Sequence, residues 1–460
     1  MPRSAFRLGL AGVFALWLAA VVWYHHAQKP VSQNGGYGWD GGKYHHMYLE
    51  VQRGERFAEE KPYVYRVASP WVAAHLGLAD ARLAFHAVNL AGVLLTGLLL
   101  FCIMSCLGAS PGISLFLVGT FFLQWHGPLR QQFYDSFTVD APSQPFTCLV
   151  FLAYLAMGRS RNRLLVLSLV TFIGVFFRES VIFATLATGL AEAVEAMREM
   201  NGMHGKSRVM AILRDRAVRS SALPLLAGIV GIAITHLMGD GGGPYSFLNT
   251  ILYYLYHKPL MVLIHAFYNG YGTALIPVLV FWRKAWASIR ERPILGIYPL
   301  ITFALGWTAG GDTTRINYWG CLALLPLMAL VLSDLKLTTF GIGSFLALEI
   351  LTTRMLFAIP DYPGPEHWRI PFLTNWGSDI PVFDLWSELA NPRVLMISLF
   401  QYLALTAFAF LWMHWIGLEK FHAKPSQPSQ PIPPQGAPQP APQSAPQPAQ
   451  QPAPNQAQAP

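Results

Sequence analysis

Apolar runs recur along this chain from residue 7 to residue 416, and short polar segments separate them. Many runs reach the roughly 17 to 25 residues that a helix needs to cross a hydrocarbon core about 30 Å thick. The pattern predicts helices at residues 7–24, 83–107, 110–125, 142–158, 164–177, 180–197, 221–238, 259–282, 294–308, 316–333, 337–357 and 393–416. The expected fold class is therefore all-α, a polytopic transmembrane helix bundle of about twelve spans.

The composition excludes the ordinary soluble classes of protein. Of 460 residues, 53% are hydrophobic and 12% are charged, whereas a typical soluble domain has about 25% charged residues. The net charge of +8 comes from Lys and Arg residues that lie between the apolar runs, so nucleic acid is not an expected partner. All 4 cysteines lie inside apolar runs, which indicates neither a disulfide framework nor a zinc site.

The basic residues also predict the orientation of the bundle, because cytoplasmic loops carry an excess of Lys and Arg. With a cytoplasmic N-terminus, the loops after even-numbered spans should be basic, and they contain Arg159, Arg161, Arg163, Arg198, Lys206, Arg208, Arg214, Arg216, Arg219, Arg283, Lys284, Arg290, Arg292, Lys336, Lys420 and Lys424. Both termini are then cytoplasmic. A single interrupted helix through Arg178 and Glu179 is the alternative, and it would invert everything downstream.

The predicted outer segments are residues 25–82, 126–141, 178–179, 239–258, 309–315 and 358–392. The first and last are long enough to fold over the membrane face, and both are rich in Trp and Tyr of the kind that lie in an interface. Residues 1–422 form one expected transmembrane domain. Residues 423–460 are a Pro, Gln, Ala and Ser tail without aromatics, which predicts disorder.

The first outer segment places an acid among glycines and aromatics. Asp40 follows Tyr37-Gly38-Trp39 and precedes Gly41-Gly42-Lys43-Tyr44. Because glycines present no side chain, a substrate can approach this acid closely. The alternative is a glycine-rich turn in which Asp40 hydrogen-bonds its own backbone.

The segment 126–141 holds two more acids, Asp135 and Asp140, next to Phe133, Tyr134 and Phe137. Their spacing does not distinguish which of the two faces a ligand. Aromatic neighbours favour Asp135, as in a wall on which a sugar stacks. Asp140 lies two residues before Pro142, so helping to start the next helix is its alternative role.

Two charged pairs occur near predicted helix ends. Ionisable residues at membrane depth are costly and indicate function by default, but the adjacent Arg178 and Glu179 can also neutralise each other. Asp312 and Arg315 lie between the ninth and tenth spans. The Arg315 guanidinium suits phosphate oxygens and keeps its proton; an Asp312–Arg315 salt bridge that caps a helix is the alternative.

Together these features resemble the GT-C superfamily of membrane glycosyltransferases, in its bacterial-type branch, over roughly residues 1–335. Members of several bacterial branches carry an Asp-Gly step, two further residues and a Tyr, followed by an aromatic-rich Tyr-Arg … Pro segment. The matching residues here are Asp40, Gly41, Tyr44, Tyr65, Arg66 and Pro70. The Arg178-Glu179 step and the Gly-Asp-x-x-Arg step at Asp312 and Arg315 are also similar to relatives.

The resemblance implies an enzyme that moves a sugar from a polyprenyl-phosphate-linked donor to a lipid or glycan acceptor, with its active site on the periplasmic side of a bacterial inner membrane. Asp40 would be the base that deprotonates the acceptor hydroxyl. Substrate-binding residues would be Tyr44, Arg66, Asp135, Asp140, Arg178, Glu179, Asp312 and Arg315, with Arg315 facing the lipid phosphate. A divalent metal is compatible with the second acid, although no metal ligands are assigned.

Adjacent histidines at 25–26 and 45–46 have no acid at a familiar ligand spacing, so interfacial packing is their expected role. Two other functional classes stay open. A transporter or flippase would place ionisable groups near the bilayer midplane, often in an internal repeat. A different membrane transferase or a polysaccharide polymerase would use a histidine, a threonine with a metal, or arginines in a large late loop. The last outer segment contains Asp361, His367, Arg369 and Asp379, so this class stays open.

Overall fold

The computed structural model describes residues 2–124, 127–200, 210–212, 214–239, 246–258, 275–309, 313–333 and 406–412, with a few scattered residues between 258 and 275 and between 333 and 406. These ranges are helical, and their one isolated β-bridge joins Phe57 and Gly239. The expected all-α class is confirmed for this part of the chain. Asp312, most of the predicted spans 259–282, 337–357 and 393–416, most of the segment 358–392, and the tail 423–460 lie outside the described residues; residues 406–412, within the last predicted span, are helical.

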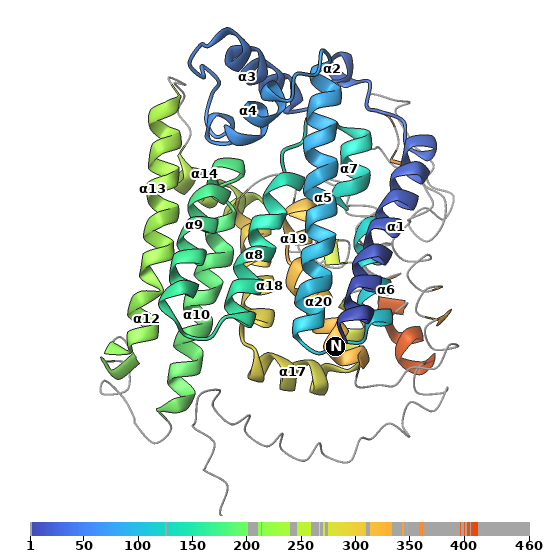
Figure 1. Cartoon of the computed structure of the whole chain (residues 1–460), viewed down its shortest axis with the longest axis vertical. Coiled ribbons are helices and arrows are strands. Elements are labelled where there is room, and N and C mark those ends of the chain that lie inside the picture. Colours follow the sequence, from blue (N-terminus) through green and yellow to red (C-terminus); the bar gives the residue numbers. More distant parts are fainter. Residues whose placement is uncertain are drawn as a thin grey trace, which may run out of the picture.

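Long helices run side by side, with a small helical layer at one end (Figure 1). The described elements are α1 (Arg3–Ala27), α2 (Gln33–Gly36), α3 (Gly41–Arg53), η1 (Tyr63–Tyr65), α4 (Ala68–His75), α5 (Ala81–Cys106), α6 (Pro111–Leu123), α7 (Pro128–Tyr134), η2 (Ala141–Ser143), α8 (Gln144–Ala156), α9 (Arg161–Phe177), α10 (Val181–Glu199), α12 (Arg216–Ser220), α13 (Ala222–Met238), α14 (Phe247–His257), α16 (Leu275–Val280), α17 (Trp282–Glu291), α18 (Ile294–Thr308), α19 (Thr313–Tyr318) and α20 (Cys321–Ser333). We call the two ends of the bundle the α3 end and the α17 end.

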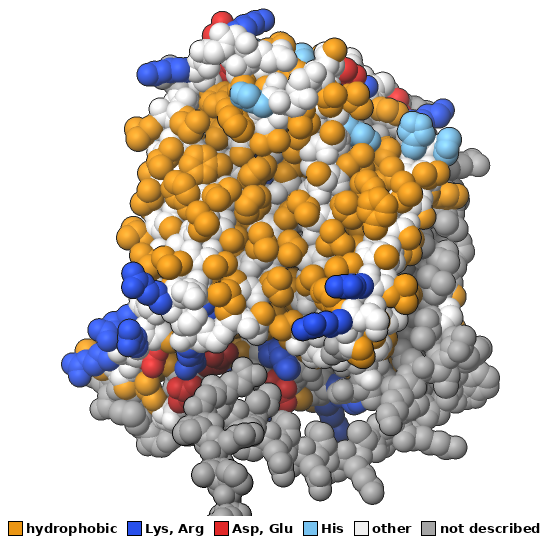
Figure 2. Space-filling model, viewed as in Figure 1, with side chains coloured by type: hydrophobic (Ala, Val, Ile, Leu, Met, Phe, Trp, Pro, Cys, Tyr) orange, Lys and Arg blue, Asp and Glu red, His pale blue; other side chains and the backbone are white. Residues whose placement is uncertain are grey.

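Within the described ranges, three helices are long and apolar enough to cross a membrane, namely Arg3–Ala27, Ala81–Cys106 and Arg216–Met238. Figure 2 shows a broad band of hydrophobic side chains between the two ends, where the charged side chains gather. Within this band Leu226 and Ile229 of α13 are each 55% exposed. Apolar surface of this extent marks contact with lipid or a partner, so the bundle has the surface of a membrane protein.

The predicted helices differ from the described ones most clearly at residues 316–333. The chain breaks there into α19 and α20, because Gly320 packs tightly against neighbouring groups. A Cβ atom on Gly320 would lie 2.5 Å from the Tyr271 ring and 2.6 Å from the Thr302 hydroxyl. The break places α19 beside α18, with its charged residue Arg315 inside the bundle.

The chain reverses at Arg178 and Glu179, so α9 and α10 are two antiparallel helices and not one interrupted helix. Arg178 has extended backbone angles, with φ at −162° and ψ at 134°. Arg159, which precedes α9, pairs with Glu195 and Glu199 at the far end of α10, at 2.9 Å and 3.1 Å. This reversal brings Arg178 and Glu179 to the loops at the α3 end.

The loop between α7 and α8 packs closely against α5. At Gly92 of α5, a Cβ atom would lie 2.8 Å from the Ala141 carbonyl oxygen and from the Pro142 Cα. Three residues earlier on the same helix, Asn89 donates a hydrogen bond to the Ser136 carbonyl at 2.9 Å. Helix α5 therefore holds the segment that carries both Asp135 and Asp140.

A buried ion-pair cluster fastens the α17 ends of α9 and α10. The Glu192 carboxylate, with a 2% exposed side chain, pairs with Arg163 and with the Arg159 Nε at 2.9 Å. Removing one partner of a buried pair leaves uncompensated charge, which costs far more than losing an exposed pair.

Glu192→Ala should lower the free energy of unfolding by about 3 kcal/mol, because two arginines lose a buried counterion. Glu199→Ala is the matched control, since that side chain is 60% exposed, and it should cost about 1 kcal/mol or less. Thermal unfolding of the purified protein in one detergent compares the two variants. Equal losses of stability would contradict the ion-pair assignment.

Candidate functional site

The candidate residues come from four separate stretches of sequence, and the structure brings them together at the α3 end. Apart from Asp312, which lies outside the described residues, they form one connected set: Asp40, Tyr44, Arg66, Asp135, Asp140, Arg178, Glu179 and Arg315. Helices α3 and α4 form a layer over this end of the bundle (Figure 1), and the pair of Arg66 with Glu179 links that layer to the reversal between α9 and α10.

Arg66 joins the layer to the bundle. Its guanidinium donates to both oxygens of Glu179, from Nη2 at 2.8 Å and from Nε at 3.1 Å. Its Nη1 also donates to the Tyr44 hydroxyl at 2.7 Å. Such bidentate pairs are strong and geometrically specific. Burial alone would raise the pKa of Glu179, but the charge and hydrogen bonds of Arg66 lower it to about 2.

Asp40 lies at the N-cap position of α3 and is half-buried. Its side chain makes no capping hydrogen bond, so it is not the self-bonded acid of a simple glycine turn. The carboxylate instead accepts a hydrogen bond from Tyr63; burial, together with the charge and hydrogen bond of Asp40, raises the Tyr63 pKa. Tyr63 is a site residue that sequence reasoning missed, although it stands three residues before Arg66.

Asp135 is packed beneath the turn that precedes Asp40. A Cβ atom on Gly38, which has a φ of +66°, would lie 2.7 Å from Asp135 Oδ2. The Phe137 N–H donates to Asp135 Oδ1 at 3.2 Å. Burial raises the pKa of Asp135 to about 7; the Phe137 N–H and the Arg315 charge oppose this rise, and the nearby Asp40 charge adds to it. At neutral pH this carboxyl group can therefore donate or accept a proton.

Asp140 forms ion pairs with two arginines. It forms an ion pair with Arg178, and its Oδ2 lies 3.3 Å from the Arg315 Nε. The Arg178 guanidinium lies over the Trp319 ring, 4.7 Å from its centre. Since Asp140 makes no side-chain cap for η2, its role in the structure is to gather cations, not to start a helix. Arg178 and Glu179 pair with different partners across the site, Asp140 and Arg66.

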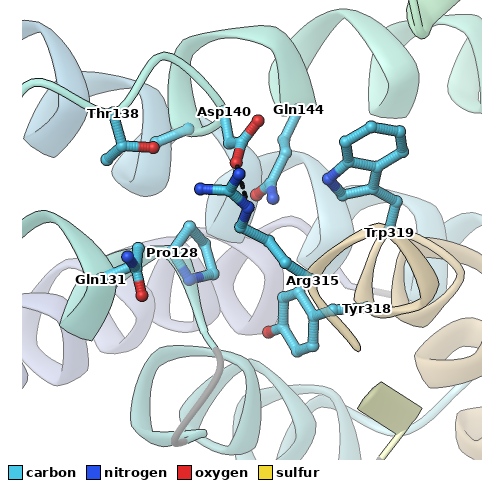
Figure 3. Close-up of a pocket in the computed structure, with 9 residues that line it drawn as sticks. Pro128, Gln131, Thr138, Asp140, Gln144, Arg315, Tyr318 and Trp319 are labelled. Carbon is cyan, nitrogen blue, oxygen red and sulfur yellow. Dashed lines mark ion pairs between the residues drawn. The ribbon is translucent and has the colours of Figure 1, made fainter. Parts of the chain in front are cut away.

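A small pocket with a cavity volume of about 10 Å³ lies beside this ion-pair cluster. Figure 3 shows the Arg315 guanidinium directed at the Asp140 carboxylate, with an aromatic wall nearby. The lining residues are Pro128, Gln131, Thr138, Asp140, Ala141, Gln144, Arg315, Tyr318 and Trp319. Two amides, a hydroxyl, an aspartate, an arginine and two aromatic rings make a lining that suits a polar, hydroxyl-rich ligand.

Sequence reasoning missed Gln131, Thr138 and Gln144 of this lining, because polar residues near helix ends are common and carry no distinctive spacing. Trp319 had a signal, since it follows Arg315 by one helical turn. His25, His26 and His45 make aromatic contacts, and the His45 and Tyr37 ring centres lie 4.8 Å apart. His46 differs, because its Nδ1 lies 2.8 Å from Glu59 Oε1. Among the described residues, no group of three His, Cys, Asp or Glu side chains is placed to hold a metal.

Comparisons with known proteins do not assign the chain to a family. The chain matches no protein-family model, and no curated protein is significantly similar to it. A function must therefore be argued from the geometry and chemistry of the site itself.

The pKa of about 7 for Asp135 predicts that a buried neutral carboxylic acid gives way to a carboxylate as the pH rises through neutrality. Infrared difference spectra of wild type against Asp135→Asn should contain the carbonyl band of that acid at pH 5 and lose it by about pH 9. Because this pKa exceeds the unfolded value of about 3.9, the group binds more protons in the folded state. Its contribution to stability should therefore fall as the pH rises from about 4 to about 7.

Asp215→Asn is the control, because Asp215 caps α12 far from the site. That variant should keep both the band and the pH dependence. A band that is absent from wild type at pH 5 would contradict the assignment.

Proposed function

We propose that this chain is a GT-C-type membrane glycosyltransferase, which moves a sugar from a polyprenyl-phosphate-linked donor to a hydroxyl group of a lipid or glycan acceptor. One observation carries the proposal: acids, arginines and aromatics from four distant segments form one cluster at one end of an apolar helix bundle, and two of its members, Asp140 and Arg315, line a pocket. Glycosyl transfer from a lipid phosphate needs a base, a phosphate site and a sugar-binding surface within reach of the membrane. The cluster offers a candidate for each.

The proposed topology has about twelve spans in a bacterial inner membrane. The N- and C-termini and the α17 end face the cytoplasm, and the α3 end faces the periplasm. Exposed basic residues at the α17 end, among them Arg161, Arg216 and Arg290, support this orientation through the positive-inside rule. The layer of α3 and α4 then covers the outer face of the bundle.

Asp40 is the proposed base. It takes the proton of the acceptor hydroxyl while the acceptor oxygen forms a bond to the anomeric carbon of the sugar. The bond from that carbon to the phosphate oxygen breaks, and the phosphate leaves with the electron pair. The hydrogen bond from Tyr63 orients the carboxylate, and the glycines after Asp40 leave space for an acceptor to approach.

Arg178 and Arg315 are the proposed phosphate ligands. Their guanidinium groups both reach Asp140, which fixes them in position before a donor binds. Negative charge grows on the phosphate as the sugar leaves, and preorganised cations stabilise that charge in the transition state. The Trp319 ring beside Arg178 gives the sugar a surface on which to stack.

Asp135 supplies a second carboxyl group near Asp40, with a pKa that burial raises to about 7. In its neutral form it donates a hydrogen bond to a substrate oxygen; in its charged form it accepts one from a sugar hydroxyl. The oxygens of Asp40 and Asp135 also suit a divalent cation such as Mg²⁺. Such a cation would neutralise phosphate charge.

Asp40→Asn should abolish transfer of a radiolabelled sugar from polyprenyl-phosphate-sugar by the purified protein, because an amide cannot take the acceptor proton. The matched control is Asp80→Asn, at the N-cap of α5, since Asn caps a helix as well as Asp does. The control should keep the wild-type rate. An Asp40→Asn protein that is folded and fully active would remove Asp40 from the mechanism.

Arg315→Ala should weaken donor binding about ten- to a hundredfold, since a charge-assisted hydrogen bond contributes about 1.5–3 kcal/mol. The measurement is inhibition of transfer by sugar-free polyprenyl phosphate, or direct binding of that lipid where turnover is lost. Arg53→Ala is the control, because the Arg53 side chain is 57% exposed at the end of α3. Unchanged affinity in the Arg315 variant would place the phosphate elsewhere.

A further inference from the structure

Helix α17 differs from the long helices of the bundle in direction and in composition. It lies across the end of the bundle, roughly perpendicular to the long helices (Figure 1). Its sequence, WRKAWASIRE, alternates tryptophans and cations within 10 residues. Neither the proposed transfer reaction nor its pocket involves this helix.

One side of α17 is fixed to the bundle. Ala285 is 2% exposed, and Ile289 packs against the start of α18, where a Cβ atom on Gly296 would lie 2.7 Å from the Ile289 Cγ2. Next to this buried side, Trp282 is 59% exposed and Trp286 is 57% exposed. Tryptophans one turn apart on a helix parallel to the membrane plane are typical of the layer between hydrocarbon and headgroups.

Cations flank the two tryptophans. The Arg283 guanidinium lies 5.5 Å from the centre of the Trp282 ring, and Arg290 is exposed near the end of the helix. Arg198, in the last turn of α10, donates a hydrogen bond to the Arg290 carbonyl and adds another charge. Glu291 pairs with Arg292 at 3.2 Å; within the described ranges no carboxylate pairs with Arg283 or Arg290.

We propose that α17 is an in-plane interfacial helix whose Arg283 and Arg290 bind the phosphates of anionic phospholipids. Trp282 and Trp286 set the depth of the helix, because indole rings prefer the headgroup level. At that depth the two guanidinium groups reach the lipid phosphates, and a negatively charged leaflet attracts exposed cations. The proposal requires the bundle to lie in a membrane, but it is independent of the reaction at the α3 end.

The test reconstitutes the full-length protein into phosphatidylcholine bilayers that contain spin-labelled phosphatidylglycerol or spin-labelled phosphatidylcholine. Electron paramagnetic resonance gives the fraction of each label that the protein immobilises. Wild type should bind phosphatidylglycerol several-fold more strongly than phosphatidylcholine. The double variant Arg283→Gln/Arg290→Gln should lose most of this selectivity, whereas Arg283→Lys/Arg290→Lys should keep most of it.

The control Arg53→Gln/Arg56→Gln removes the same charge from the α3 end and should behave as wild type. Unchanged selectivity in the α17 Gln variant would overturn the proposal. So would an equal loss in the α3-end control, because that result would assign the selectivity to total charge. Gel filtration and helical circular dichroism establish that each variant is folded, which is expected because all four side chains are exposed.

Discussion

The forked ion pair between Arg66 and Glu179 is the interaction on which the arrangement of the site depends. It joins residues 113 positions apart in sequence, one in the layer of α3 and α4 and the other at the reversal between α9 and α10. The same arginine holds Tyr44, and with it the start of α3, where Asp40 lies. Without this pair, the layer of α3 and α4 would lose its ion pair with the reversal between α9 and α10.

The carboxyl groups of the site divide into separate roles because their surroundings differ. Glu179 is ionised and paired, which fixes structure. Asp140 is surrounded by two arginines and positions cations. Asp135 is buried close to another acid, so it exchanges a proton near neutrality. Asp40 is half-buried and accepts a hydrogen bond from Tyr63.

The sequence was sufficient for the all-α class of the described residues, because apolar periodicity is a local signal. The site residues that it predicted lie together at the α3 end, apart from Asp312, which lies outside the described residues. The sequence could not show which charges pair. Adjacent Arg178 and Glu179 suggested mutual neutralisation, yet the chain reversal directs them to Asp140 and Arg66. Tyr63 and Gln144 had no local signal, and the break at Gly320 depends on Tyr271 and Thr302, which come from other parts of the chain.

The proposed function can be examined with the wild-type protein alone. Purified protein in lipid vesicles would be given one radiolabelled sugar in two forms, linked to polyprenyl phosphate or to a nucleotide, together with a mixture of envelope lipid and glycan acceptors. We expect labelled product from the polyprenyl-linked sugar only. Transfer from the nucleotide-linked sugar alone, or no transfer from any common polyprenyl-linked sugar, would contradict a lipid-phosphate glycosyltransferase.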